Sequence, residues 1–163
     1  MPSVLVAVGT DHHPFVRVMG WIAAWTEPEV EWVVQHGYSV PPPNASAAMS
    51  LFDQPTLSAH LHRARAVVCH GGPGLIMDAV HAGHRPVVVP RDPERGEHVD
   101  GHQVAFVSWL RDRSDIRVAT DEKSFRRCLL AALTDGPRPP QASGGTDVAR
   151  RFGTLVDELV YGR

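Results

Sequence analysis

The hydrophobic positions of the chain fall into short apolar runs that are separated by longer segments with helical periodicity. Residues 4–8 form an apolar run closed by Gly9 and Thr10, and residues 14–25 then carry apolar side chains at helical spacing. This pattern predicts a strand, a loop and a helix, and similar patterns follow. Further strands are predicted at residues 31–35, 66–69, 86–89 and 116–119, and further helices at residues 50–65, 73–82, 104–110, 121–133 and 146–161.

The predicted strands are apolar throughout and do not alternate with polar residues. Such strands are typical of a parallel sheet with helices on both faces, because a sheet that is buried twice has no solvent-facing positions. The chain is therefore predicted to form a Rossmann-like doubly wound α/β fold. Ligands of such folds bind outside the carboxyl ends of the strands, near the point where the strand order reverses. The loops that directly follow the strands are the candidates for a binding site.

Prolines interrupt the pattern between the second and third predicted strands. Three prolines at residues 41–43 cannot continue a hydrogen-bonded ladder, so residues 41–48 are predicted to form a loop. The following helix is expected to begin near Ser50, although Pro55 lies close to that start.

Other boundaries are set by capping residues and by glycine and proline. Gly83 is expected to end one helix, and Thr120 is expected to cap another. The Gly/Pro-rich segment at residues 136–145 predicts a loop or linker before the terminal helix. The length of 163 residues suits a single domain over residues 1–163.

The composition is that of an ordinary soluble protein. Hydrophobic residues make up 43% and charged residues 21%, and no apolar run is long enough to span a bilayer. The formal net charge of -2 offers no broad positive surface, which argues against a nucleic-acid partner. The N-terminus has no basic leader or small-residue cleavage site, so we expect a cytoplasmic protein.

Neither the cysteines nor the histidines have the spacing of a metal site. Cys69 and Cys128 are isolated thiols that form neither a disulfide framework nor a zinc site, and both are expected in the core. The ten histidines are scattered without a paired ligand spacing. No metal site is therefore expected.

A glycine-bearing turn between a strand and a helix is the clearest chemical feature. Gly71, Gly72 and Gly74 bracket Pro73 at a predicted helix start, where free N–H groups and the helix dipole attract phosphate. The turn matches neither the dinucleotide glycine pattern nor the Walker lysine pattern, so neither NAD nor ATP is favoured. Taken alone, it is equally consistent with a tight turn that binds nothing.

The surrounding residues give this turn a family context. The resemblance rests on VLVAVGT at residues 4–10, VVCHGGPG at 67–74, Asp78-Ala79, Ala82-Gly83, PVVVPR at 86–91 and GEHVDGHQ at 96–103. Over most of residues 3–133 the chain resembles the C-terminal domain of the family-28 glycosyltransferases. Similar stand-alone members include the catalytic subunit of the UDP-GlcNAc transferase of asparagine-linked glycosylation and bacterial exopolysaccharide transferase subunits. The resemblance implies one half of a GT-B architecture.

The resemblance assigns the donor diphosphate to the glycine turn. In relatives this turn holds the diphosphate against the helix N-terminus, which implies that role for His70, Gly71, Gly72, Pro73 and Gly74. An acidic residue of the same helix bonds the ribose hydroxyls in relatives, and Asp78 occupies that position here. The bound molecule would be a UDP-sugar donor substrate, with no tightly bound cofactor.

Two other loops receive roles from the resemblance. Glu97 and His98 lie where related enzymes contact the hydroxyls of the transferred sugar, although a charged surface loop is the alternative reading. Gly9 and Thr10 form a second phosphate-side loop. His12 and His13 follow directly, and a histidine there could contact the acceptor, carry a proton or assist the leaving diphosphate as the catalytic group.

The implied reaction is an inverting sugar transfer from a UDP-sugar to a lipid-linked acceptor, and it needs no metal. The general base belongs to the other domain in two-domain relatives, so a separate, membrane-associated acceptor-binding subunit is expected to supply it. Trp21, Trp25 or the terminal helix could dock on that partner, although tryptophans at such positions are more often part of the core.

Three alternatives remain open. A non-catalytic nucleotide-sugar-binding module is one, because Asp78 replaces a common glutamate and Leu75 replaces a small hydroxyl residue of many relatives. A structural subunit of a glycosyltransferase complex without a ligand is the second. A sugar-nucleotide epimerase-like enzyme is the third, but such enzymes need two complete domains.

Overall fold

Six parallel strands form one sheet in the order β3-β2-β1-β4-β5-β6. The computed structural model describes residues 1–139, 150, 151, 153–155, 157, 158, 161 and 162. The strands are β1 (Ser3–Ala7), β2 (Glu31–Gln35), β3 (Ala47–Met49), β4 (Ala66–His70), β5 (Val87–Val89) and β6 (Arg117–Val118), and the helices are α1 (Val16–Ala23), α2 (Gln54–Arg63), α3 (Pro73–His81), the short 3-10 helix η1 (Pro93–Arg95), α4 (His102–Arg111) and α5 (Glu122–Asp135).

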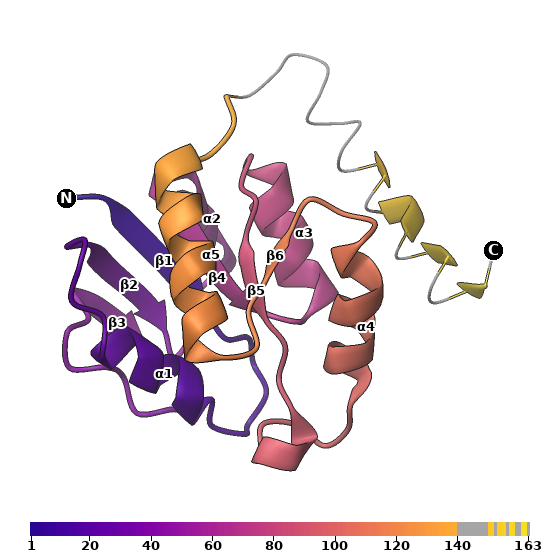
Figure 1. Ribbon diagram of the computed structural model, residues 1–163, viewed down its shortest axis with the longest axis horizontal. Coiled ribbons are helices and arrows are strands. Elements are labelled where there is room, and N and C mark those ends of the chain that lie inside the picture. The colour runs from indigo at the N-terminus through magenta and orange to yellow at the C-terminus, as the bar shows by residue number, and fades with distance from the viewer. Residues whose placement is uncertain (140–149, 152, 156, 159–160, 163) are drawn as a thin grey trace.

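Helices cover both faces of this sheet (Figure 1). On one face, Val4 and Val6 of β1 belong to a buried cluster with residues of α1 and α5. On the other face, Leu5 and Ala7 of the same strand pack with residues of α2 and α3, and α3 and α4 share a third cluster with Val88 of β5. Both faces of β1 are therefore buried, which is why this strand is apolar at every position. The predicted doubly wound α/β fold is confirmed.

The strand β3 was not expected, because the sequence predicts a loop over residues 41–48. Ala47, Ala48 and Met49 are all exposed and pair in parallel with β2 at the edge of the sheet. A three-residue edge strand has no buried face, so it leaves no hydrophobic alternation for sequence reasoning to detect. Only its backbone pairing defines it.

The start of α2 corrects the expected helix start near Ser50. The helix begins at Gln54, and the side chain of Asp53 accepts a hydrogen bond from the backbone N–H of Thr56 at 2.8 Å. Pro55 lies in the first turn, where its missing N–H costs no helical hydrogen bond. The proline therefore marks the start of the helix.

The N-cap of α5 also differs from the prediction and lies one residue later than expected. Asp121, and not Thr120, accepts the N–H of Ser124 at 2.7 Å, while the Ser124 hydroxyl accepts the Asp121 N–H at 3.1 Å. This reciprocal capping box satisfies two helix-terminal donors, which a single threonine hydroxyl cannot do. Gly83 follows the end of α3 with a φ of +90°, so its expected role as a helix terminator is confirmed.

The thiols and tryptophans lie mostly in the interior. Cys69 is buried, and burial raises the pKa of its thiol above the ordinary range, so it is an inert core residue. Cys128 is only partly buried at the edge of the core. Trp25 is buried and its indole N–H donates to the carbonyl of Pro28 at 2.8 Å, which rules it out as an exposed docking residue.

The predicted terminal helix and the preceding loop fall partly outside the described residues. Residues 136–139 are described and are not helical, whereas 140–149 lie outside the description. The described residues among 150–161 are helical, and Leu155 packs against the cluster of α3 and α4. In the described part of the chain, no helix combines the length and apolar character of a membrane span.

Candidate donor-binding site

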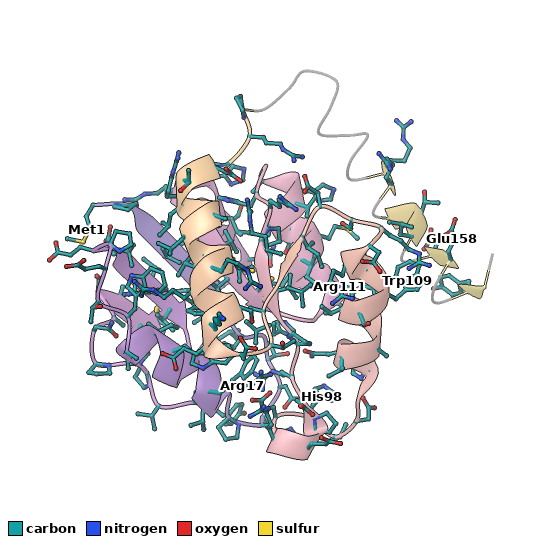
Figure 2. All side chains as sticks on the ribbon, viewed as in Figure 1. Met1, Arg17, His98, Trp109, Arg111 and Glu158 are labelled. Atoms are coloured by element: carbon teal, nitrogen blue, oxygen red, sulfur yellow. The ribbon has the colours of Figure 1, made fainter. Side chains whose placement is uncertain are left out.

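The strand order reverses between β1 and β4, because the chain crosses from the β3 edge to the other side of β1. Val6 pairs with Val68 and Ala7 with Cys69, so the loops that follow these two strands leave the sheet side by side. The loop after β5 lies next to them, since His70 pairs with Val89. In doubly wound sheets this reversal is where ligands bind. Figure 2 shows Arg17 and His98 at this end of the molecule, far from Met1.

The three glycines of the turn after β4 have different surroundings. Gly71 is buried, and its N–H donates to Oε1 of Gln103 at 3.1 Å, so this donor is not free for a ligand. Gly72 caps α3 and faces the ring of His70. Gly74 is exposed, with no atom within 4 Å of the place where a Cβ would stand. The first-turn donors at Gly74 and Leu75 have no acceptor within the helix, so the outer part of the turn offers the phosphate-facing N–H groups.

His70 ends β4, and its ring fills the space beside two glycines. A Cβ on Gly9 would lie 2.5 Å from Nε2 of His70, and a Cβ on Gly72 would collide with the same ring. Gly9 also has a φ of +78°, which disfavours any other residue. The glycines of two loops therefore accommodate one imidazole.

The protonation of His70 follows from its surroundings. Burial, aided by the charge of Arg91, lowers the pKa of His70 to about 4. The Oε1 atom of Gln103 accepts the N–H groups of Gly71 and Arg91, so its amide nitrogen must be the atom that faces Nδ1 of His70 at 3.3 Å. His70 is therefore neutral at pH 7, with its proton on Nε2.

Arg91 is fully buried and joins the loops after β1 and β5. Its guanidinium donates to the carbonyls of Val8 at 2.8 Å, His13 at 2.8 Å and Glu97 at 3.1 Å, and it lies over the ring of Phe15 at 4.8 Å. Burial lowers the pKa of Arg91, which the carboxylates of Asp11 and Glu97 oppose, yet a guanidinium stays protonated at neutral pH. Among the described residues, no carboxylate oxygen lies within ion-pair distance of it. Its charge therefore adds positive potential at this end of the sheet.

Glu97 has a structural environment that the sequence did not predict. Arg17 donates to both of its carboxylate oxygens, at 2.7 and 3.0 Å, and the N–H of Asp92 donates to Oε2 at 2.9 Å. Arg17 also donates to the carbonyls of Thr120 and Pro90, each at 2.8 Å. The Glu97 side chain is only 4% exposed. Both oxygens are thus engaged within the protein, which leaves His98 as the more accessible of the two expected sugar contacts.

The loop after β1 carries the remaining predicted residues. Asp11 accepts the backbone N–H of His13 at 2.8 Å and lies 2.6 Å from Nδ1 of the same residue. Its second oxygen lies 3.3 Å from Nε2 of His98, so this carboxylate joins two loops. Thr10 and His12 are exposed. The loop is held by side chains and carries two accessible polar groups.

Asp78 lies one turn after Gly74 on α3 and is partly buried. Its carboxylate has no hydrogen bond or ion pair with the part of the chain that the structure describes. It is thus available to a ligand that lies along the first turns of α3.

Four residues of the site had no predicted role: Asp11, Arg17, Arg91 and Gln103. Arg91 could have been found as the first charge after a fully apolar strand, and Asp11 as the one carboxylate between Thr10 and two histidines. Nothing in the sequence pairs Arg17 with Glu97, 80 positions away. Gln103 of α4 accepts the backbone N–H groups of both Gly71 and Arg91, and these contacts exist only in the folded chain.

The fold and this site define one Rossmann-like half of the GT-B architecture. The model of the glycosyltransferase family 28 C-terminal domain matches residues 3–120, and the chain belongs to that family. No match was found among curated proteins.

Two solved structures with a similar fold are larger proteins. One is the glycosyltransferase of kitacinnamycin, with a TM-score of 0.61 and 20% identity over 97% of this chain and 39% of that one. The other is MurG of Acinetobacter baumannii, with a TM-score of 0.51 and 14% identity over 97% of this chain and 49% of that one. The chain therefore spans less than half the length of either. At these identities the likeness concerns the fold.

Replacing Glu97 with glutamine is expected to lower the free energy of unfolding by about 2 kcal/mol, because the partly buried guanidinium of Arg17 would lose its ionised partner. Chemical denaturation at pH 7 measures this change. Asp112→Asn is the matched control, since Asp112 pairs with Arg111 on the surface at 3.6 Å and its side chain is 73% exposed. Equal effects of the two substitutions would contradict the structural role of the Arg17–Glu97 pair.

Proposed function

We propose that the chain binds a UDP-sugar and forms the donor-binding catalytic part of an inverting glycosyltransferase. The observation that carries the proposal is the open N-terminus of α3 at the reversal of strand order, where Gly74 is exposed and unobstructed. The family adds support, because its name describes a glycosyltransferase domain. A diphosphate is the anion that such a terminus would hold.

Charge favours an anionic ligand at the same place. Arg17 is neutralised by Glu97, whereas Arg91 contacts only backbone carbonyls among its hydrogen-bond partners. The buried charge of Arg91 and the dipole of α3 would both stabilise the negative charge that grows on a departing diphosphate. Thr10 would add a hydroxyl contact to a phosphate oxygen.

Each other candidate residue has a role in this proposal. Asp78 would accept the ribose hydroxyls, and His98 would contact the transferred sugar. His13, oriented by Asp11, would assist the leaving diphosphate, with the exposed His12 beside it. Glu97 would act through Arg17 by holding the loop that carries His98. The neutral ring of His70 would support the glycine turn by packing against Gly72.

The acceptor side of the reaction would come from outside these 163 residues, since the chain covers only 39% and 49% of the two similar enzymes. We propose that a separate, membrane-associated subunit binds a lipid-linked acceptor and supplies the general base that deprotonates its hydroxyl. The reaction would then take place at the cytoplasmic face of a membrane.

Calorimetric titration with UDP, UDP-GlcNAc, UDP-glucose, UDP-glucuronate and dTDP-glucose tests the donor site. One UDP-sugar is expected to bind, and Gly74→Ala is expected to weaken it at least about tenfold, because the added methyl group would stand where the phosphates approach. Gly20→Ala in α1 is the matched control, since Gly20 also has no atom within 4 Å of a Cβ. Asp78→Asn should weaken nucleotide binding and spare binding of inorganic diphosphate.

Two outcomes would redirect the proposal. Absence of binding to every nucleotide would contradict the donor site and favour a structural subunit. Binding without sugar transfer would favour a non-catalytic binding module. To test for transfer, the chain and a labelled UDP-sugar are incubated with membranes that contain the acceptor subunit, and the label in the extracted lipid is measured.

A further inference from the structure

Three potential metal ligands of the loop after β1 cluster at the rim of the donor site, and a fourth, from the loop after β5, contacts one of them. Asp11, His12 and His13 follow β1, and their ligand atoms all lie within 4.8 Å of one another. His98, from the loop after β5, places Nε2 at 3.3 Å from Oδ2 of Asp11, the carboxylate oxygen that does not contact His13. The fold therefore adds a fourth donor atom, Nε2 of His98, from a residue that is distant in sequence.

These side chains are accessible but not freely mobile. Asp11 and His13 are 21% and 23% exposed and His98 is 11% exposed, while His12 is exposed and lies against His13 with ring centroids 4.1 Å apart. Arg91 anchors both loops through the carbonyls of His13 and Glu97. A rigid set of donors with one open side can bind an ion without reorganising the chain.

The donor chemistry selects the kind of ion. Three imidazoles and one carboxylate suit a borderline transition metal such as Zn²⁺, whereas Mg²⁺ and Ca²⁺ prefer oxygen ligands. The nearby charge of Arg91 also disfavours a cation held by electrostatics alone, so binding must come from the coordinate bonds of the imidazoles. A transition metal meets this requirement.

The far side of the His98 ring is also supported. Its Nδ1 accepts the backbone N–H of Asp100 at 3.4 Å, and a carboxylate oxygen of Asp100 lies 3.6 Å away. Coordination of an ion through Nε2 would move the ring proton to Nδ1, and the Asp100 carboxylate is near enough to accept it after a small shift, which is the usual support of a metal-bound histidine. Asp100 also contacts the exposed His102, which belongs to this outer layer.

We propose that Asp11, His12, His13 and His98 form a binding site for one Zn²⁺-like transition-metal ion. This site revises the expectation, drawn from local spacing, that the histidines bind no metal. Local spacing does not indicate a site that includes His98, because His98 lies on another loop, far from Asp11 in the sequence. The ion would share His13 and His98 with the donor of the proposed function, but the metal site does not depend on the identity of the nucleotide.

Metal binding can be measured directly on the full chain after treatment with EDTA. Calorimetry with Zn²⁺ is expected to give one ion per chain, and Co²⁺ is expected to give the intense visible absorption of a four-coordinate site, which Zn²⁺ then removes. Asp11→Asn, His13→Ala and His98→Ala should each weaken Zn²⁺ at least about tenfold. His81→Ala is the control, because His81 is an exposed histidine on α3, away from these loops in sequence.

Absence of Zn²⁺ binding to the wild-type chain would overturn the proposal. So would binding that survives both His13→Ala and His98→Ala, since it would belong to other histidines. Thermal unfolding of each variant shows whether a loss of Zn²⁺ affinity comes from misfolding. Asparagine is chosen at position 11 because it keeps the shape of the aspartate side chain and should leave the fold intact. A UDP-sugar titration in EDTA decides the donor site separately, so the failure of either proposal leaves the other testable.

Discussion

Arg91→Met is expected to lower the free energy of unfolding by roughly 3 to 5 kcal/mol, a larger loss than that expected for Glu97→Gln. Methionine matches much of the buried volume but cannot donate a hydrogen bond. The carbonyls of Val8, His13 and Glu97 would then remain buried or partly buried without the donors they now have. Urea denaturation at pH 7 measures the change.

The same substitution should also separate the loops of the site. Because Arg91 is the only described side chain that donates to both the β1 loop and the β5 loop backbones at His13 and Glu97, Zn²⁺ and UDP-sugar affinity should fall with it. Arg95→Met is the control, since Arg95 is 57% exposed and its contact with Asp92 spans 3.6 Å. A loss below about 1 kcal/mol in Arg91→Met would show that water replaces the guanidinium, and would contradict its role as the anchor.

Acidification is expected to destabilise the chain by about 3 kcal/mol between pH 7 and pH 4, through His70 alone. The pKa of His70 falls from 6.5 to about 4 in the folded chain, so the unfolded chain binds a proton in this interval and the folded chain does not. The contribution of neutral His70 is complete above pH 6.5 and is lost as the pH falls toward 4. Burial also lowers the pKa of His84, which adds a change of the same sign.

Denaturation curves at half-unit intervals from pH 7.5 to pH 4.0 measure this dependence. His70→Gln should flatten the dependence, because glutamine does not titrate, and the comparison concerns the slope against pH and not the absolute stability. His62→Gln is the control, as His62 is exposed. Identical slopes for wild type and His70→Gln would mean that the ring of His70 takes up a proton without unfolding. The lowered pKa values of Asp11 and Asp121 act mainly below pH 4 and leave this interval to the histidines.

The fold was largely predictable because burial on both faces leaves a direct trace in the sequence. Strands such as β1 and β4 must be apolar at every position, and the helices between them must have one apolar stripe. The predictions failed where that trace is absent. The exposed edge strand β3 buries nothing, and the exact cap of α5 depends on a reciprocal pair of hydrogen bonds.

From the sequence one could predict only which loops carry the candidate site. The glycines after β4 were identified from their position between a strand and a helix, and the residues after β1 and β5 from the family resemblance; the structure brings these loops together. The state of each group was not predictable. Gly71 has its N–H engaged by Gln103, Glu97 is paired with Arg17, and His70 is held neutral by burial.

By itself, the sequence determined that a doubly wound α/β domain forms and which strand ends carry glycine and histidine, because hydrophobic periodicity and local turn chemistry act between near neighbours along the chain. Only the tertiary structure decided which of these residues meet. Hydrogen bonds and ion pairs depend on distances of a few ångströms between segments tens of residues apart, as between Asp11 and His98 or between Arg17 and Glu97. The strand order of the sheet sets those distances, and no pattern of residues along the chain records it.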